Sequence, residues 1–239
     1  MYKQLNIDEI LTPEKFLEYE RQFIGNERID YILKCIDKDG MKIIDIGGAS
    51  GFFLNELIKK TSYSVDASNL DVDNFYFDKQ VNSNIKFINK SILHSALKDE
   101  TYDIVTFRHI LHHIVSDNVK KTLENQKHAM KEMLRIVKKG GFLIFEEEVN
   151  NVKLFSRIIF LLSKFASKIK FNIEYFEAGK VVVSFLTKKE IRFILSNLNN
   201  SSKYSLEVFK YIKWNMPFRW KITLLMASVG AMFVVLKKE

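Results

Sequence analysis

Short apolar runs alternate with amphipathic stretches along most of the chain. Between the runs, residues 51–60 and 117–138 carry apolar side chains at helical spacing. Continuous apolar runs are typical of strands buried on both faces, and the intervening helices would cover those faces. The pattern predicts an α/β fold with a doubly wound, mostly parallel sheet. The predicted strands are residues 42–46, 67–71, 85–88, 103–107 and 142–145.

The two ends of the chain add further elements. Residues 12–37 carry a helical pattern that is expected to break near Gly25-Asn26. Toward the other end, residues 204–213 alternate like a strand.

Residues 187–239 also contain signals for the start of one helix and the end of another. Thr187 and Glu190 have the spacing of a capping box, which predicts a helix that begins there. Residues 222–230 predict a helix that turns at Gly230 into a last strand, Ala231–Leu236.

A glycine-rich turn joins the first strand to the helix that follows. Gly47, Gly48 and Gly51 lie between the apolar run that ends at Ile46 and the helical residues from Phe52 onward. Glycines let the main chain bend sharply and let a ligand approach closely. The N-terminus of a helix also favours an anionic group. The turn therefore predicts a site for an anionic or carboxylate-bearing cofactor.

Three families of glycine loop bind cofactors in such a position. A phosphate-binding P-loop requires Gly-Lys-Ser/Thr, where this chain has Phe52-Phe53. The dinucleotide fingerprint requires glycine at the positions of Gly47, Ala49 and Phe52, so it fails. The segment Asp45–Gly51 instead resembles motif I of class I S-adenosylmethionine-dependent methyltransferases, with Ala49 in place of the usual middle glycine.

Three later segments strengthen this resemblance because they follow in the family's order. Thr101–Val105 matches the fourth strand, Leu111–His113 the segment after it, and Lys139–Leu143 the turn into the fifth strand. The resemblance is to small-molecule methyltransferases with a domain of type 11, 12 or 25. It implies a Rossmann-like sheet of seven strands with the last one antiparallel. It also implies an N-terminal helical segment and a helical lid after the fifth strand.

We interpret the chain as a single methyltransferase domain over residues 1–239. Its length fits one larger α/β domain, and its two prolines leave no proline-rich linker. The predicted parts are the N-terminal helices (1–38), the cofactor-binding core (39–150), the lid or acceptor segment (151–186) and the C-terminal helix and strands (187–239).

The resemblance implies which residues hold S-adenosylmethionine. The loop would pass beneath the methionine portion, with Asp45 near the ammonium group. An acid at the end of the second strand would bind the ribose hydroxyls. We expect Asp71 rather than Asp66, because residues 72–77 after it resemble a helix start. Ser91 stands where the family offers an acidic or polar residue to adenine. The implied cofactor-binding set is Asp45, Gly47, Gly48, Ser50, Gly51, Asp71, Ser91, Ile92, Phe107 and Arg108.

Histidines follow the fourth strand. His109 is the candidate catalytic residue, since a neutral imidazole is a competent general base. His112 and His113 lie roughly on the same helical side as His109. Their alternative to a catalytic role is structural packing and hydrogen bonding. The three histidines lack the glutamate of the zinc-protease motif, so no metal site is predicted. Glu146–Glu148, after the fifth strand, are either acceptor contacts or surface carboxylates.

Residues 152–171 predict a basic amphipathic helix. It is a lid over the acceptor pocket, an interfacial membrane helix, or a helix that packs with its lysines in water. We favour the lid over the membrane helix, because the family commonly places acceptor contacts after the fifth strand. The apolar stripe comprises Phe155, Ile158, Ile159, Leu162, Phe165, Ala166 and Ile169, and the cations are Lys153, Arg157, Lys164 and Lys168.

Composition narrows the setting. The net charge of +8 would suit nucleic acid, an anionic substrate or an acidic membrane, but the lysines are scattered, which favours charges spread over solvated faces and makes nucleic acid an unlikely partner. Cys35 is the single cysteine, so an internal disulfide is excluded and a cytoplasmic setting is expected. The polar start of the chain predicts no signal peptide. The apolar stretch 222–236 is shorter than the roughly 20 residues of a transmembrane helix.

The sequence predicts an S-adenosylmethionine-dependent methyltransferase that acts on a small-molecule acceptor by in-line displacement. One alternative is methylation of RNA or another polyanion, motivated by the net charge. Another is a non-catalytic cofactor-binding module, motivated by Ser91 at the adenine position. A nicotinamide-dependent oxidoreductase is disfavoured by Ala49 and Phe52. Neither the acceptor atom nor the oligomeric state follows from the sequence.

Overall fold

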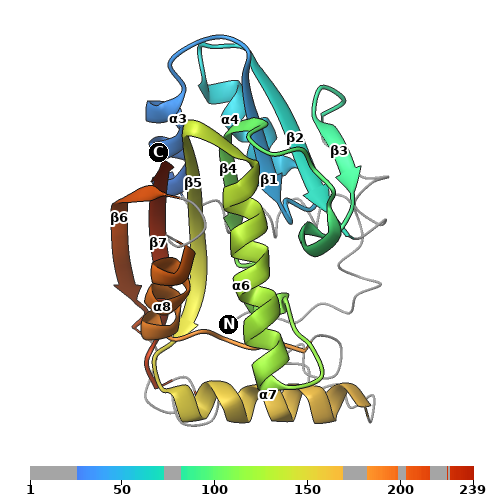
Figure 1. Ribbon diagram of the computed structural model, residues 1–239, viewed down its shortest axis with the longest axis vertical. Coiled ribbons are helices and arrows are strands. Elements are labelled where there is room, and N and C mark those ends of the chain that lie inside the picture. The colour runs from blue at the N-terminus through green and yellow to red at the C-terminus, as the bar shows by residue number, and fades with distance from the viewer. Residues whose placement is uncertain (1–25, 73–81, 169–181, 199–202, 216–224, 226) are drawn as a thin grey trace.

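A sheet runs through the molecule with helices on both of its faces (Figure 1). The computed structural model describes residues 26–72, 82–168, 182–198, 203–215, 225 and 227–239. Within these residues the sheet has seven strands in the order β3-β2-β1-β4-β5-β7-β6. The strands are β1 (Met41–Ile46), β2 (Val65–Asp71), β3 (Lys86–Asn89), β4 (Tyr102–Arg108), β5 (Val137–Asn150), β6 (Tyr204–Lys213) and β7 (Val229–Lys238).

The five strands from β3 to β5 are parallel, whereas β7 is antiparallel to both of its neighbours, β5 and β6. The prediction of a doubly wound, mostly parallel sheet with an antiparallel last strand is confirmed. The strand order reverses at β1, because β2 and β3 lie on one side of it and β4 on the other. In open α/β sheets, ligands bind at the carboxyl ends of the strands beside such a reversal.

Two layers of helices cover the sheet. Neighbouring residues of β1 show how: Ile43 lies in the core cluster with Leu54, and Ile44 lies in the cluster with Met130. Because both faces are buried, the parallel strands have continuous apolar runs. The helices are α3 (Asn26–Cys35) and α4 (Phe52–Lys60) on one face, α6 (Val119–Ile136) and α8 (Lys188–Leu198) on the other, α7 (Lys153–Lys168), and the 3-10 turns η1 (Ile92–His94) and η2 (Leu111–His113).

Most strand boundaries differ from the prediction by one or two residues, and β5 differs most, since it begins at Val137 instead of residue 142. β5 continues to Asn150 instead of ending at Phe145, because its ladder with β7 extends to the pair Asn150–Val229. The predicted turn at Gly230 is wrong, since Gly230 lies inside β7 and pairs with β6. A Cβ at Gly230 would lie 2.3 Å from the main-chain oxygen of Ile212. The close approach of β6, and not a turn, therefore requires this glycine.

The predicted capping box begins α8. Thr187 N donates to Glu190 Oε2 at 2.9 Å, and Glu190 N donates to Thr187 Oγ1 at 3.1 Å. The predictions for residues 12–25, 73–77 and 222–224 lie outside the described residues. No helix in the described ranges combines the length and hydropathy needed to cross a bilayer.

Helix α7 occupies most of the predicted stretch 152–171, but its apolar stripe does not pack as one face. Ala166 is buried, whereas Leu162 and Phe165 are exposed. Phe155, Ile158 and Ile159 are half-buried, and Ile169 lies outside the described residues.

Candidate active site

The loop between β1 and α4 lies at the carboxyl edge of the sheet, at the reversal of strand order. Its main chain is left-handed at Gly47 (φ 70°), Ala49 (φ 46°) and Gly51 (φ 81°). This conformation suits glycine but costs alanine roughly 1–2 kcal/mol. Two side chains from β2 hold Ala49 in place. Asn69 Nδ2 donates to Ala49 O at 2.8 Å, and Ala49 N donates to Asp71 Oδ2 at 3.1 Å.

Polar side chains crowd Gly48. A Cβ at this position would lie 2.3 Å from Asn69 Oδ1 and 2.6 Å from Asp45 Oδ2. Asn69 Oδ1 is buried and makes no hydrogen bond within the described residues. Glycine at this position is what allows both side chains to lie directly against the loop.

The two candidate ribose ligands lie at opposite ends of β2. Asp71 ends the strand, half-buried, with its carboxylate on the loop. Asp66 is the second residue of the strand, is exposed, and lies roughly 16 Å back along it. Of the two carboxylates, Asp71 is the one beside the loop.

Asp45 pairs with Arg28 of α3, a residue that the sequence analysis missed. Arg28 Nη1 lies 3.4 Å from Asp45 Oδ1 and 3.4 Å from Thr106 Oγ1, and its guanidinium stacks 3.6 Å from the centre of the Phe53 ring. Burial raises the pKa of Asp45 to about 6 despite the opposing charge of Arg28. Burial also lowers the pKa of Arg28. The buried carboxylate therefore has an arginine as its ion-pair partner and lies against Gly48.

Several predicted cofactor residues have side chains that are buried or engaged in local contacts. Ser50 is fully buried. Ser91 Oγ caps η1 by accepting from a main-chain N–H two residues later, and Ile92 is buried in the core. Phe107 is fully buried and stacks on Phe145 with ring centroids 4.6 Å apart. The side chains of Ile92 and Phe107 belong to the core, which leaves their main chain for contact with a ligand.

Charged pairs join the ends of β4 and β5. Arg108 Nε lies 2.9 Å from Glu146 Oε2, and His109 Nδ1 lies 2.8 Å from Glu148 Oε1. Burial lowers the pKa of Arg108, against the opposing charge of Glu146. Burial acts to raise the pKa of Glu148, but the hydrogen bond and charge of His109 outweigh it, so this pKa is lowered. His109 and Glu148 are each about one-fifth exposed, at 20% and 22% of their side chains.

His112 and His113 lie in η2 and make structural contacts. His112 Nδ1 lies 2.6 Å from Glu147 Oε1, and the other oxygen of Glu147 accepts from Leu111 N at 2.8 Å. The His112 ring also stacks on Phe185 at 5.1 Å. Burial, with the neighbouring His112, lowers the pKa of His113 to about 3, so His113 is neutral at physiological pH. In the ranges that the structure describes, no three His, Cys, Asp or Glu side chains gather in a way that could hold a metal ion.

Two residues that organise the loop were not predicted from the sequence. Asn69 had a usable signal, because it is a polar residue inside the apolar run of β2, where a buried side chain needs a partner. Arg28 had none, since its helix carries several charges and only tertiary packing brings it to Asp45.

Residues 44–145 match the family model described as a methyltransferase domain. The matched range runs from β1 into β5 and includes the glycine loop, Asp71 and His109. Residues 44–145 belong to a class I S-adenosylmethionine-dependent methyltransferase domain. The enzyme's sequence matches no curated protein.

Solved structures share the fold of the methyltransferase at low sequence identity. A methyltransferase from Methanosarcina mazei is 18% identical, with a TM-score of 0.59 over 87% of this chain and 96% of its own. The complex of the Haloferax volcanii Trm112 methyltransferase activator with its methyltransferase partner gives 13% identity and a TM-score of 0.60 over 94% and 92%. A protein from Bacillus halodurans gives 12% and 0.59 over 90% and 99%. At these identities the likeness is one of fold.

The loop of the methyltransferase fits S-adenosylmethionine. Glycines at three of its positions leave the main chain open to a ligand. The half-buried carboxylate of Asp71 can accept from two neighbouring hydroxyls, as a ribose requires. The first turn of α4 directs N–H groups and the positive end of its dipole toward the same edge, which suits a carboxylate. S-adenosylmethionine is thus the cofactor of this enzyme.

Proposed function

We propose that the enzyme methylates a hydroxyl or amine of a small-molecule acceptor, with His109 as the general base. The observation that carries this proposal is the contact of 2.8 Å between His109 Nδ1 and Glu148 Oε1 at the carboxyl edge of the sheet. S-adenosylmethionine, when bound, supplies the methyl group and its own leaving group. The protein then has to orient the acceptor, exclude water and remove a proton.

The Glu148 carboxylate supports a defined protonation state of the base. As an acceptor, it holds the Nδ1–H tautomer of His109, which leaves Nε2 free to take a proton. The lowered pKa of Glu148 keeps this carboxylate charged. Neutral His113 adds no positive charge beside the pair. An imidazole hydrogen-bonded to a carboxylate in this way is a recurrent general base in enzymes.

For the cofactor we propose Asp71 as the ribose ligand and Gly47, Gly48 and Gly51 as the surface beneath the methionine portion. The hydrogen bond from Ala49 N to Asp71 Oδ2 supports this, because it ties the ribose ligand to the loop. The remaining proposed contacts are those of Asp45, Ser50, Ser91, Ile92, Phe107 and Arg108, mainly through their main chain where the side chain is buried.

A small acceptor is favoured over RNA by the distribution of charge. A hollow lined mainly by cations lies where β4 and β5 begin, at the opposite edge of the sheet from His109. Beside His109 itself, in contrast, lie the carboxylates of Glu148 and Glu146, the latter paired with Arg108. Carboxylates directly at the proposed base disfavour the approach of a polyanion to it. The cations of the hollow are Lys131, Arg135, Lys139, Lys203 and Lys238.

Incubation of the enzyme with isotopically labelled S-adenosylmethionine and a metabolite extract would test the proposal. We expect mass spectrometry to find a labelled small molecule with the enzyme, and far less of it with His109→Asn. If the label appeared in RNA instead, the proposal of a small-molecule acceptor would be wrong. If His109→Asn labelled the product as fast as the wild type, His109 would not be the general base, although the enzyme would still be a methyltransferase. Cofactor binding without any labelled product would favour a non-catalytic module.

A further inference from the structure

Helix α7 presents bulky apolar side chains to solvent. Leu154 is 65% exposed, Leu161 60%, Leu162 57% and Phe165 62%. Helical residues three, four or seven positions apart lie on the same side, so these residues form one stripe together with half-buried Ile158. We call these five residues the outer stripe. Exposed apolar side chains grouped in this way mark an interaction surface.

Hydrogen bonds fix the orientation of α7. Its inner side buries Ser156, Phe160 and Ser163. Ser156 Oγ donates to Asn150 O at 3.1 Å, and Ser163 Oγ accepts from Val183 N at 3.3 Å. A rotation that buried the outer stripe would break these bonds and carry the serines into solvent. The outward position of the stripe is therefore built into the packing of the helix.

Cations follow one side of the outer stripe. Lys153, Arg157, Lys164 and Lys168 all belong to α7, which contains no acidic residue. Lys153 and Arg157 contact Glu190 of α8, and Lys164 donates to Asp117 O, whereas Lys168 is exposed at the end of the helix. An apolar stripe with cations beside it is typical of helices that lie in the interface of an anionic membrane.

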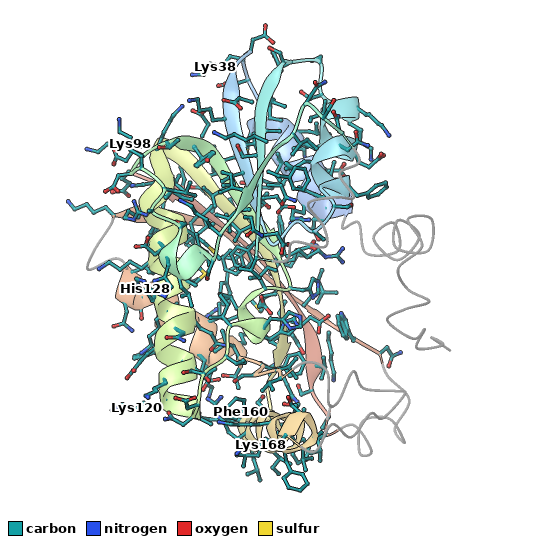
Figure 2. All side chains as sticks on the ribbon, turned by 90° about the vertical axis from the view of Figure 1, so that its right-hand side faces the viewer. Lys38, Lys98, Lys120, His128, Phe160 and Lys168 are labelled. Atoms are coloured by element: carbon teal, nitrogen blue, oxygen red, sulfur yellow. The ribbon has the colours of Figure 1, made fainter. Side chains whose placement is uncertain are left out.

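The position of α7 suits a flat surface. Figure 1 shows the helix lying across one end of the molecule, beyond the carboxyl end of β5. Figure 2, which views this end of the molecule from the side, shows side chains projecting from α7 away from the sheet. A helix of 16 residues is about 24 Å long, so its whole outer side can meet a plane at once.

We propose that α7 is an interfacial helix that inserts the outer stripe into the surface of a membrane containing anionic lipids. The stripe consists of leucine, isoleucine and phenylalanine and offers no hydrogen-bonding group. Protein interfaces normally surround their apolar contacts with a polar rim and carry direct hydrogen bonds. Lipid chains require no such bonds, and the neighbouring cations match anionic headgroups. A bilayer is therefore the occupant that this surface fits.

Vesicle co-sedimentation of the full chain tests the proposal. The vesicles are phosphatidylcholine alone, or phosphatidylcholine with phosphatidylserine. We expect binding to the anionic vesicles that weakens as salt is added. The double variant Leu161→Ser/Phe165→Ser should lower the partition coefficient at least about tenfold. The matched control is Phe193→Ser/Leu206→Ser, which removes apolar side chains of similar exposure from α8 and β6. The control should bind like the wild type.

Three results would overturn the proposal. The first is a vesicle assay in which Leu161→Ser/Phe165→Ser binds no more weakly than the wild type, which includes the case that neither protein binds. The second is a wild-type dimer in sedimentation velocity that Leu161→Ser/Phe165→Ser converts to a monomer, since the stripe would then bind a second copy. The third is a marked fall in the unfolding temperature of the α7 double variant, which would show that the stripe is buried by the protein itself.

Discussion

His109 Nδ1 lies 2.8 Å from Glu148 Oε1, and this contact joins the end of β4 to β5. The main chain of His109 is left-handed, with φ 56°, and its N–H donates to Glu146 O at 2.9 Å. A left-handed conformation is costly for a histidine unless the surroundings hold it. Here β5 holds both the main chain and the ring, so the position of the imidazole is defined before any acceptor arrives.

Removal of the proposed base should slow methyl transfer without lowering the affinity for the cofactor. We expect His109→Asn to lower kcat about 10²–10⁴-fold, the usual contribution of general base catalysis. Glu148→Gln should lower it at least about tenfold, because the ring loses its carboxylate partner. Steady-state kinetics on the labelled product would measure both effects, and calorimetry with S-adenosylhomocysteine should show unchanged affinity.

His128→Asn is the matched control for the base. His128 is exposed on α6, where its Nε2 lies 3.3 Å from Leu93 O, and should keep wild-type kcat. A wild-type kcat for His109→Asn would exclude the proposed role.

The two aspartates of β2 should differ in their effect on cofactor binding. Asp71→Asn should weaken S-adenosylhomocysteine binding about tenfold to a hundredfold, since a charged acceptor of hydrogen bonds is lost. Asp66→Asn, at the other end of the strand, should leave the affinity unchanged. Isothermal titration would measure both dissociation constants. The reverse ranking would assign the ribose to Asp66.

A methyl group at Gly48 should damage the loop. Its Cβ would meet Asn69 Oδ1 at 2.3 Å and Asp45 Oδ2 at 2.6 Å, so one of these side chains must move. We expect Gly48→Ala to cost about 1–3 kcal/mol of stability. Saturating S-adenosylmethionine stabilises a protein that binds it by several kcal/mol. In Gly48→Ala this stabilisation should be smaller than in the wild type.

Gly140→Ala is the control for Gly48→Ala. It also strains the main chain, at φ 78°, but its Cβ has nothing within 4 Å. It should lower the stability by roughly 1–2 kcal/mol but leave the thermal stabilisation by S-adenosylmethionine unchanged. An intact ligand shift in Gly48→Ala would contradict the proposed path of the cofactor.

Loss of Arg28 alone should be worse than loss of the whole ion pair. Arg28→Met leaves the buried carboxylate of Asp45 without its counter-ion and should cost about 3–5 kcal/mol. Arg28→Met/Asp45→Asn removes both charges and should recover part of that loss. Urea unfolding of the two variants measures the difference. Equal stability of the single and the double variant would show that the pair is not coupled.

Asp45 also predicts a pH dependence of stability. Its pKa is raised to about 6 in the folded protein, above the value of about 3.9 in an unfolded chain. Between roughly pH 4 and pH 6, the folded state therefore binds a proton that the unfolded state does not, so stability increases as the pH falls. Relative to Asp45→Asn, the wild type should gain about 2–3 kcal/mol from pH 7 to pH 4. No gain relative to Asp45→Asn over this range would contradict the raised pKa.

Local patterns predicted the elements of the core because each depends on neighbours in the chain. The run that ends at Ile46, the glycines at 47, 48 and 51 and the helix from Phe52 follow from periodicity and main-chain freedom. The extension of β5 to Asn150 could not be predicted in this way. Its last residues include glutamates, and they stay in the sheet because β7 supplies hydrogen bonds along the whole edge.

The sequence by itself determined the fold class, because burial on both faces leaves local patterns along the chain. It also indicated the cofactor, because the glycine turn and the segments after it resemble those of the methyltransferase family. The tertiary structure alone decided the partners of the charged groups. The ion pair of Arg28 with Asp45 and the contact of His109 with Glu148 join residues distant in sequence. The same holds for α7. Its periodicity gives an apolar stripe, but the hydrogen bonds of Ser156 and Ser163 decide that Leu161 faces outward. Periodicity shows which residues share a face, and only packing shows what that face meets.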